Sequence, residues 1–147
     1  MKIAFWKGTD PGFGGVLDRS IRWWTNGSYS HCELIFSDGW TGSCSWSEGG
    51  VVLLQRSASY YDPKNWDIVE IEGDEAAARA WFKKNRGTPY DLLGDFGFVW
   101  RPIRGEDGAY FCSEAIALSL GWPNAWRYDP NTQADVLRIP KYRPAAV

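Results

Sequence analysis

The stretch Ser-His-Cys-Glu-Leu-Ile-Phe at residues 30–36 contains the only histidine of the chain. It follows a turn signal at residues 26–27 (Asn-Gly) and precedes another at residues 37–39 (Ser-Asp-Gly), which indicates a β-strand. Because side chains of a strand alternate between its two faces, we expect His31 and Glu33 on one face and Cys32 on the other. The histidine is therefore predicted to stand on a strand with a carboxylate on the same face.

A second stretch, Tyr-Phe-Cys-Ser-Glu-Ala-Ile at residues 110–116, indicates that a helix begins at Cys112. We expect this helix to cover residues 113–120 and to be stopped by Gly121 and Pro123. A helix N-terminus and a nearby imidazole both lower the pKa of a thiol, and the thiolate is the reactive form of cysteine. Cys112 and His31 are therefore the pair that best indicates a reactive site.

The rest of the chain predicts an α+β fold whose middle is mostly antiparallel sheet. Strands are expected at residues 3–6, 30–36, 40–46, 51–55 and 66–71, and further helices at residues 16–24, 76–84 and 88–96. Residues 104–108 are expected to form a polar loop, and residues 136–139 a short final strand. The 147 residues fit a single domain that spans residues 1–147.

Composition excludes several classes of protein. A hydrophobic fraction of 44% is typical of a globular chain, and no run reaches the roughly 18 apolar residues of a membrane-spanning helix. The first residues lack the apolar core and cleavage site of a signal peptide, so the cytoplasm is the default location. Three cysteines without Cys-x-x-Cys spacing argue against a disulfide framework and a zinc site. A net charge of −2 with mixed signs provides no basic surface for nucleic acid. No metal or cofactor is predicted.

The order of these parts resembles that of the permuted NlpC/P60 cysteine hydrolases, a papain-like group in which the histidine strand precedes the nucleophile helix. The resemblance covers most of the chain. It rests on the early glycine-rich turn and helix, the histidine strand, and residues 48–51 (Glu-Gly-Gly-Val), 87–91 (Gly-Thr-Pro-Tyr-Asp) and 111–114 (Phe-Cys-Ser-Glu). It implies a papain-like α+β fold, in which an antiparallel sheet packs against the nucleophile helix and flanking helices. Several small proteins of this pattern are encoded by phages.

Carried over residue by residue, the resemblance makes Cys112 the nucleophile and His31 the general base. The backbone N–H of Cys112 would be one oxyanion donor, and the hydroxyl of Tyr90 is a second candidate. The family also orients its histidine through a third polar group, usually on the following strand.

Three residues are candidates for that third group. The strand after the histidine offers Ser43 and Ser45, whereas Glu33 shares a strand face with His31. A hydroxyl would hold the ring but would stabilise the imidazolium less than a carboxylate does.

Each of these residues also has a purely structural interpretation. Cys112 can be a small buried apolar residue, and His31 a hydrogen-bonded residue of the sheet. Solvation, packing or a favourable position near a helix dipole would account for Glu33, Tyr90 and Glu114. No function is assigned to the other two cysteines, Cys32 and Cys44.

The resemblance implies a thiol hydrolase that cleaves an amide bond of a peptide or cell-wall peptide through an acyl-enzyme on Cys112. One alternative is a catalytically weak or inactive binding module of the same fold that recognises peptidoglycan or a lipid or acyl ligand. Another alternative is a lipid acyltransferase, because relatives with the same permuted core transfer acyl groups.

Overall fold

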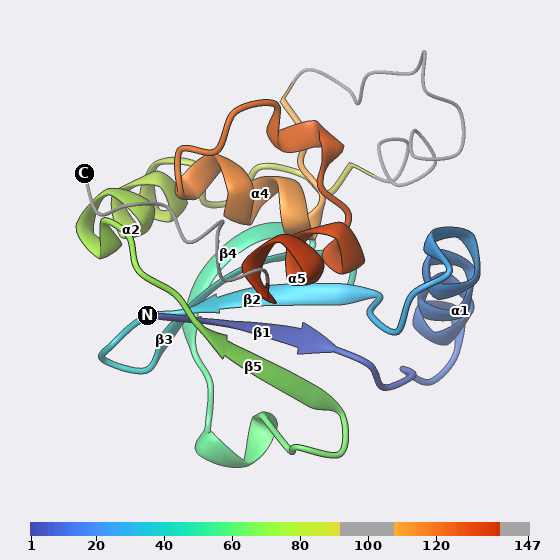
Figure 1. Ribbon diagram of the computed structural model, residues 1–147. Coiled ribbons are helices and arrows are strands. Elements are labelled where there is room, and N and C mark those ends of the chain that lie inside the picture. The colour runs from blue at the N-terminus through green and yellow to red at the C-terminus, as the bar shows by residue number, and fades with distance from the viewer. Residues whose placement is uncertain (92–107, 139–147) are drawn as a thin grey trace.

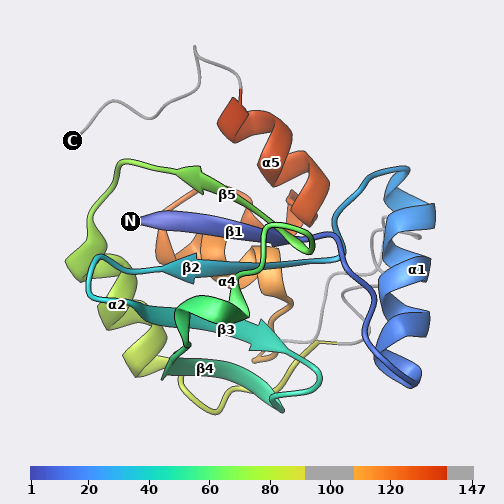
Figure 2. The ribbon, with the colours of Figure 1, turned by 90° about the horizontal axis from the view of Figure 1, so that it is seen from below.

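The computed structural model describes residues 1–91 and 108–138. A five-stranded antiparallel sheet forms its centre, with the strands in the order β4-β3-β2-β1-β5 (Figures 1 and 2). The strands are β1 (Lys2–Trp6), β2 (His31–Ile35), β3 (Trp40–Ser45), β4 (Gly50–Gln55) and β5 (Trp66–Glu70). All five lie within one residue of the predicted bounds at each end. The predicted α+β class with an antiparallel sheet is confirmed.

Helices cover one face of this sheet. The α-helices of the described residues are α1 (Phe13–Thr25), α2 (Glu75–Lys84), α4 (Cys112–Ser119) and α5 (Pro130–Arg138), and the short 3-10 helices are η1 (Ala58–Tyr60) and η2 (Ala125–Arg127). Figure 1 shows α2, α4 and α5 on one side of the sheet and the loop that carries η1 on the other. α1 lies beyond the ends of the strands (Figure 2). No helix within residues 1–91 and 108–138 has the length and apolar character needed to cross a bilayer.

Strand β2 shows how this arrangement follows from the sequence. Cys32 and Leu34 are fully buried in the apolar core together with Phe82 of α2 and Ile116 of α4. Each large apolar side chain buried in this way contributes about 1.5–3 kcal/mol to folding. Glu33, on the opposite face, is also fully buried, because the η1 loop covers it. A charged residue therefore lies in the interior, where it needs partners.

α1 directs its polar face toward the protein. Asp18 is buried and its carboxylate accepts hydrogen bonds from the Ser30 hydroxyl at 2.7 Å and from the Asp10 backbone N–H at 2.8 Å. Arg22 donates to the backbone carbonyl of Gly8. These bonds fix α1 against the end of β1 and the start of β2, and leave much of its apolar face exposed. The exposed apolar side chains of α1 are Phe13, Val16, Trp23 and Trp24.

The predicted strand at residues 136–139 is wrong, because residues 136–138 belong to α5. The Asp129 carboxylate accepts hydrogen bonds from the backbone N–H groups of Asn131 and Thr132 at 2.8 and 3.1 Å. Pro130 then occupies the first helical position, where its missing N–H costs nothing. The sequence Asp-Pro is thus a helix start signal, and the short apolar run that follows it lies on the helix. Ile139 lies outside the described residues.

The predicted helix at residues 88–96 is not found where the structure describes it. Residues 88–91 are not helical, and Tyr90 forms an isolated β-bridge with Tyr110. The remaining residues of that helix, and residues 104–107 of the predicted polar loop, lie outside the described residues. The bridge brings residue 90 beside the segment that leads into α4.

Candidate active site

Cys112 is the first residue of α4, as the sequence predicts. Phe111 precedes it in an extended conformation, and Phe111 and Ile116 are buried beneath the helix. The carboxylate of Glu114, in the first turn, accepts a hydrogen bond from the backbone N–H of Phe111, which is one of the two bonds of a capping box. Burial nevertheless raises the pKa of Glu114 to about 7. Glu114 thus caps the helix, in agreement with its structural interpretation.

The pairing between β2 and β3 is interrupted where Cys112 packs on the sheet. β2 pairs with β3 only at Leu34 and Ile35, although β3 continues to pair with β4 as far as Ser45. The first residues of β2 therefore have no partner on the β3 side. α4 packs against both strands, and Cys112 lies close to Cys32 and His31 at this opening.

Two neighbours hold the Cys112 sulfur. The thiol and the backbone N–H of Cys32 lie beside it, and so does the His31 ring. The Cys32 thiol is the largest influence, and together these groups hold the pKa of Cys112 well below its usual value, although burial acts in the opposite direction. Burial alone would lower the pKa of His31, but its contacts with Cys112 and Glu33 hold that pKa well above its usual value. The pair therefore favours a thiolate beside an imidazolium.

Glu33 and Ser43 both approach the other side of the His31 ring. The His31 Nε2 atom lies 3.6 Å from Glu33 Oε1 and 3.4 Å from Ser43 Oγ. Burial alone would raise the pKa of Glu33, but the neighbouring His31 ring and the ion pair with Arg56 lower it to about 2. Glu33 is therefore a carboxylate at neutral pH, and it supplies a fixed negative charge beside the imidazole.

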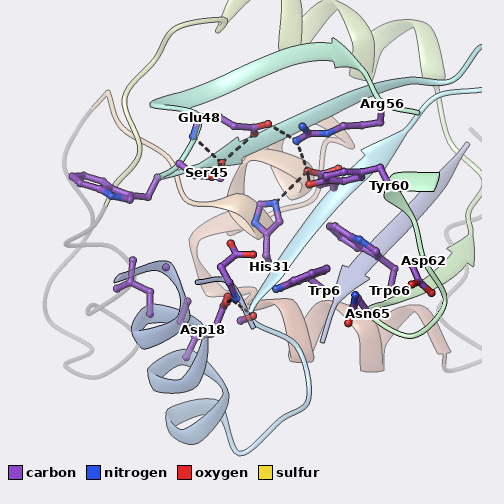
Figure 3. A pocket seen from close by; sticks show the side chains of 18 of the residues that line it. Trp6, Asp18, His31, Ser45, Glu48, Arg56, Tyr60, Asp62, Asn65 and Trp66 are labelled. Carbon is purple, nitrogen blue, oxygen red and sulfur yellow. Dashed lines mark hydrogen bonds and ion pairs between the residues drawn. The ribbon is translucent and has the colours of Figure 1, made fainter. Parts of the chain in front are cut away.

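Three residues of the segment after β4 hold the Glu33 carboxylate, and sequence reasoning missed all of them. Arg56 Nη2 donates to Glu33 Oε1 at 2.8 Å, and the Tyr61 hydroxyl donates to Oε2 at 2.9 Å. The Tyr60 hydroxyl donates to Oε1 at 3.3 Å. Arg56 also pairs with Glu48 (Figure 3). A glutamate that is buried on a covered face of a sheet needs a cationic partner. Arg56, directly after β4, is the residue of the sequence that could have indicated this partner.

Ser45 and Cys44 of β3 form hydrogen bonds with other partners than His31. Ser45 donates to Glu48 at 3.1 Å and lies near Ser47, and it has no hydrogen bond to His31 in the described residues. Cys44 is fully buried and its thiol donates to the Tyr110 carbonyl at 3.0 Å.

A cavity of about 620 Å³ opens beside His31. Figure 3 shows the imidazole at its centre, with Glu48 and Arg56 on one side, Trp6 and Trp66 on another, and Asp18 of α1 on a third. Tyr90 also lines this cavity, as do the apolar α1 residues Leu17 and Ile21. Cys112 is only 2% exposed and does not line the cavity, whereas His31 does. No group of three metal-binding side chains is found in the part of the chain that the structure describes.

Comparisons of this chain with protein-family models, with curated proteins and with solved structures found no match.

Proposed function

We propose that the protein is a thiol hydrolase of the permuted NlpC/P60, papain-like kind that cleaves an amide bond of a peptide or cell-wall peptide. The observation that carries this proposal is the continuous chain of contacts from Glu33 through His31 to Cys112. A helix N-terminus, an imidazole and a fixed carboxylate are the three elements that activate a cysteine nucleophile.

In this proposal, Cys112 gives its proton to His31, and the thiolate attacks the carbonyl carbon of the substrate. The backbone N–H of Cys112 stabilises the oxyanion, because Cys112 is the first residue of α4 and the N–H groups of a helix's first turn have no intrahelical acceptor. The imidazolium of His31 then protonates the departing amine, and an acyl-enzyme remains on the sulfur. A water molecule activated by His31 hydrolyses this thioester and restores the free thiol. Glu33 stabilises the imidazolium in both halves of the cycle.

A labelling experiment tests the proposal. Iodoacetamide at pH 7 should alkylate Cys112 at least about tenfold faster than Cys32 or Cys44, because a thiolate reacts and a thiol does not. All three sulfurs are buried, so the comparison depends on ionisation more than on exposure. His31→Ala should slow the alkylation of Cys112 by about tenfold or more, whereas Ser45→Ala, a nearby residue that hydrogen-bonds Glu48 instead, should leave it unchanged. Equal reactivity of the three thiols would contradict the proposal.

One observation favours a second candidate function. Cys112 is 2% exposed, and a binding module of the same fold that uses the cavity without turnover would need no access to the sulfur. Incubation with a panel of peptide, peptidoglycan and lipid substrates, followed by mass spectrometry, separates the candidates. A hydrolase should carry a transient acyl group on Cys112, and an acyltransferase should pass that group from a lipid donor to an added acceptor. Binding of a panel member without any adduct on the wild type would support the binding module.

A further inference from the structure

Cys32 takes no part in the bond-making and bond-breaking steps of the hydrolysis proposed above, yet it lies beside the Cys112 sulfur. Both its thiol and its backbone N–H reach that sulfur, because β2 has no β3 partner at this position. The two cysteines lie in the same buried core, with exposures of 0% and 2%. Two thiols that lie beside each other in one buried cluster are suited to forming a covalent bond.

Gln133 of α5 fixes the position of Cys32. The Cys32 thiol donates to Gln133 Oε1 at 3.4 Å, and Gln133 Nε2 donates to the Ser113 carbonyl at 3.2 Å. Gln133 is fully buried, so neither hydrogen bond competes with solvent. The amide therefore ties Cys32 of β2 to the residue that follows Cys112 in the first turn of α4.

The third thiol is held elsewhere. Cys44 lies on β3, and its thiol donates to the backbone carbonyl of Tyr110 at 3.0 Å. Cys44 and Cys32 are both fully buried, but Cys44 hydrogen-bonds Tyr110 whereas Cys32 hydrogen-bonds Gln133. Cys44 provides a matched control for any property attributed to Cys32.

From this arrangement we propose that Cys32 is a resolving cysteine, which captures Cys112 after oxidation by a hydroperoxide and forms a reversible Cys32–Cys112 disulfide that blocks the nucleophile. The inference rests on the reactive Cys112 thiolate of the proposed function, but not on its substrate.

The chemistry proceeds in two steps. The Cys112 thiolate attacks one oxygen of hydrogen peroxide, so that an S–O bond forms, the O–O bond breaks, and the departing hydroxide takes a proton from His31 to leave as water. The Cys32 sulfur then attacks the sulfenic sulfur, so that the S–S bond forms, the S–O bond breaks, and the departing hydroxide takes the Cys32 proton. The two sulfurs lose two electrons in total, which reduce one peroxide to two molecules of water.

The ionisation of the two thiols sets the order of these steps. Burial and the neighbouring Cys112 hold the pKa of Cys32 well above its usual value, so Cys32 stays protonated while Cys112 is a thiolate. Peroxide reacts with thiolates, and Cys112 is therefore the sulfur that it attacks first.

The test treats the full-length protein with about one equivalent of hydrogen peroxide, blocks free thiols, and maps disulfides by mass spectrometry without reduction. Cleavage after acidic residues separates Cys32 from Cys44, because Glu33 and Asp38 lie between them. The expected product is a Cys32–Cys112 disulfide that dithiothreitol reverses. In Cys32→Ser and Cys32→Ala, Cys112 should instead stop at the sulfenic acid with one equivalent and proceed to the sulfinic acid when a second equivalent is added, whereas Cys44→Ser should form the same disulfide as the wild type.

Two results would overturn the inference. One is a Cys112 that is overoxidised at the same rate in the wild type and in Cys32→Ser; the other is a disulfide that joins Cys112 to Cys44. Circular dichroism establishes that each variant is folded. Fast alkylation of Cys112 without a disulfide would refute the resolving role and leave the proposed hydrolase standing. A Cys112 that reacts with neither reagent would refute both.

Discussion

The Glu33 carboxylate carries a full negative charge in the protein interior, and its neighbours explain why it stays ionised. Arg56, Tyr60 and Tyr61 donate to it from one side, and His31 meets it from the other. Such a carboxylate cannot rotate freely, so it holds the imidazole at a fixed angle as well as stabilising its charge. Ser43 contacts the same Nε2 atom but contributes only a hydroxyl dipole.

This difference predicts unequal effects of two substitutions on the reactivity of Cys112. Glu33→Gln removes the negative charge, which should lower the pKa of His31 and shift the pH–rate profile of iodoacetamide alkylation to higher pH. At pH 7 the rate should fall by about tenfold, the equivalent of about one pKa unit. Ser43→Ala should change it by less than about threefold. If Ser43→Ala had the larger effect, Ser43 would be the group that orients His31.

At the scale of elements, local signals determined which parts of the fold were predictable. The helix α2 begins at the Asp74 cap, whose carboxylate accepts from the Ala77 N–H at 2.9 Å, and the hairpin of β2 and β3 contains its own turn. Both are encoded by residues close in sequence. Arg56, Tyr60 and Tyr61 reach Glu33 across the sheet from an irregular loop, and no local pattern encodes that contact. Alternation along β2 placed Cys32 in the core, but it could not indicate that the neighbouring strand ends early.

The start of β4 carries the strictest backbone requirement near the site. Gly50 has a φ of 128°, and a Cβ atom there would lie 2.0 Å from the Thr88 carbonyl oxygen. That close approach allows the Val51 N–H to donate to Thr88 O at 2.9 Å, and the Gly87 N–H to donate to Val51 O at the same distance. These bonds hold the segment that carries Tyr90 against the sheet edge.

We therefore predict that Gly50→Ala lowers the free energy of unfolding by about 3 kcal/mol or more, since it combines backbone strain with a backbone clash. Gly49→Ala is the matched control, because Gly49 also has a positive φ of 75° but a Cβ there would contact nothing within 4 Å. It should cost only about 1–2 kcal/mol. Urea unfolding followed by tryptophan fluorescence measures both. Equal losses of unfolding free energy in the two variants would show that the clash with Thr88 does not destabilise Gly50→Ala.

On the scale of the whole molecule, the site is assembled from segments distant in sequence. β1 and α1 line different sides of the cavity, β2 supplies His31, and the η1 loop fixes Glu33 (Figures 1 and 3). α4 supplies Cys112, and Gln133 of α5 hydrogen-bonds to the first turn of α4. The histidine strand and the cysteine helix were identifiable from their own residues. The rest of the site depends on tertiary packing, and so does the stability of the buried charges within it.

The buried Glu33 carboxylate predicts how stability depends on pH. Its pKa is about 2 in the folded protein, because His31 and Arg56 outweigh burial, and the unfolded chain has the ordinary value of 4.5. A depressed pKa contributes stability that is fully present above the unfolded value and is lost as the pH falls through the folded value. This contribution amounts to about 3 kcal/mol. The difference in unfolding free energy between the wild type and Glu33→Gln, measured with urea at several pH values, should therefore shrink steadily as the pH falls from about 5 toward 2. A difference that did not change with pH would mean that Glu33 is protonated in the folded state, which would remove the charge that the proposed site requires.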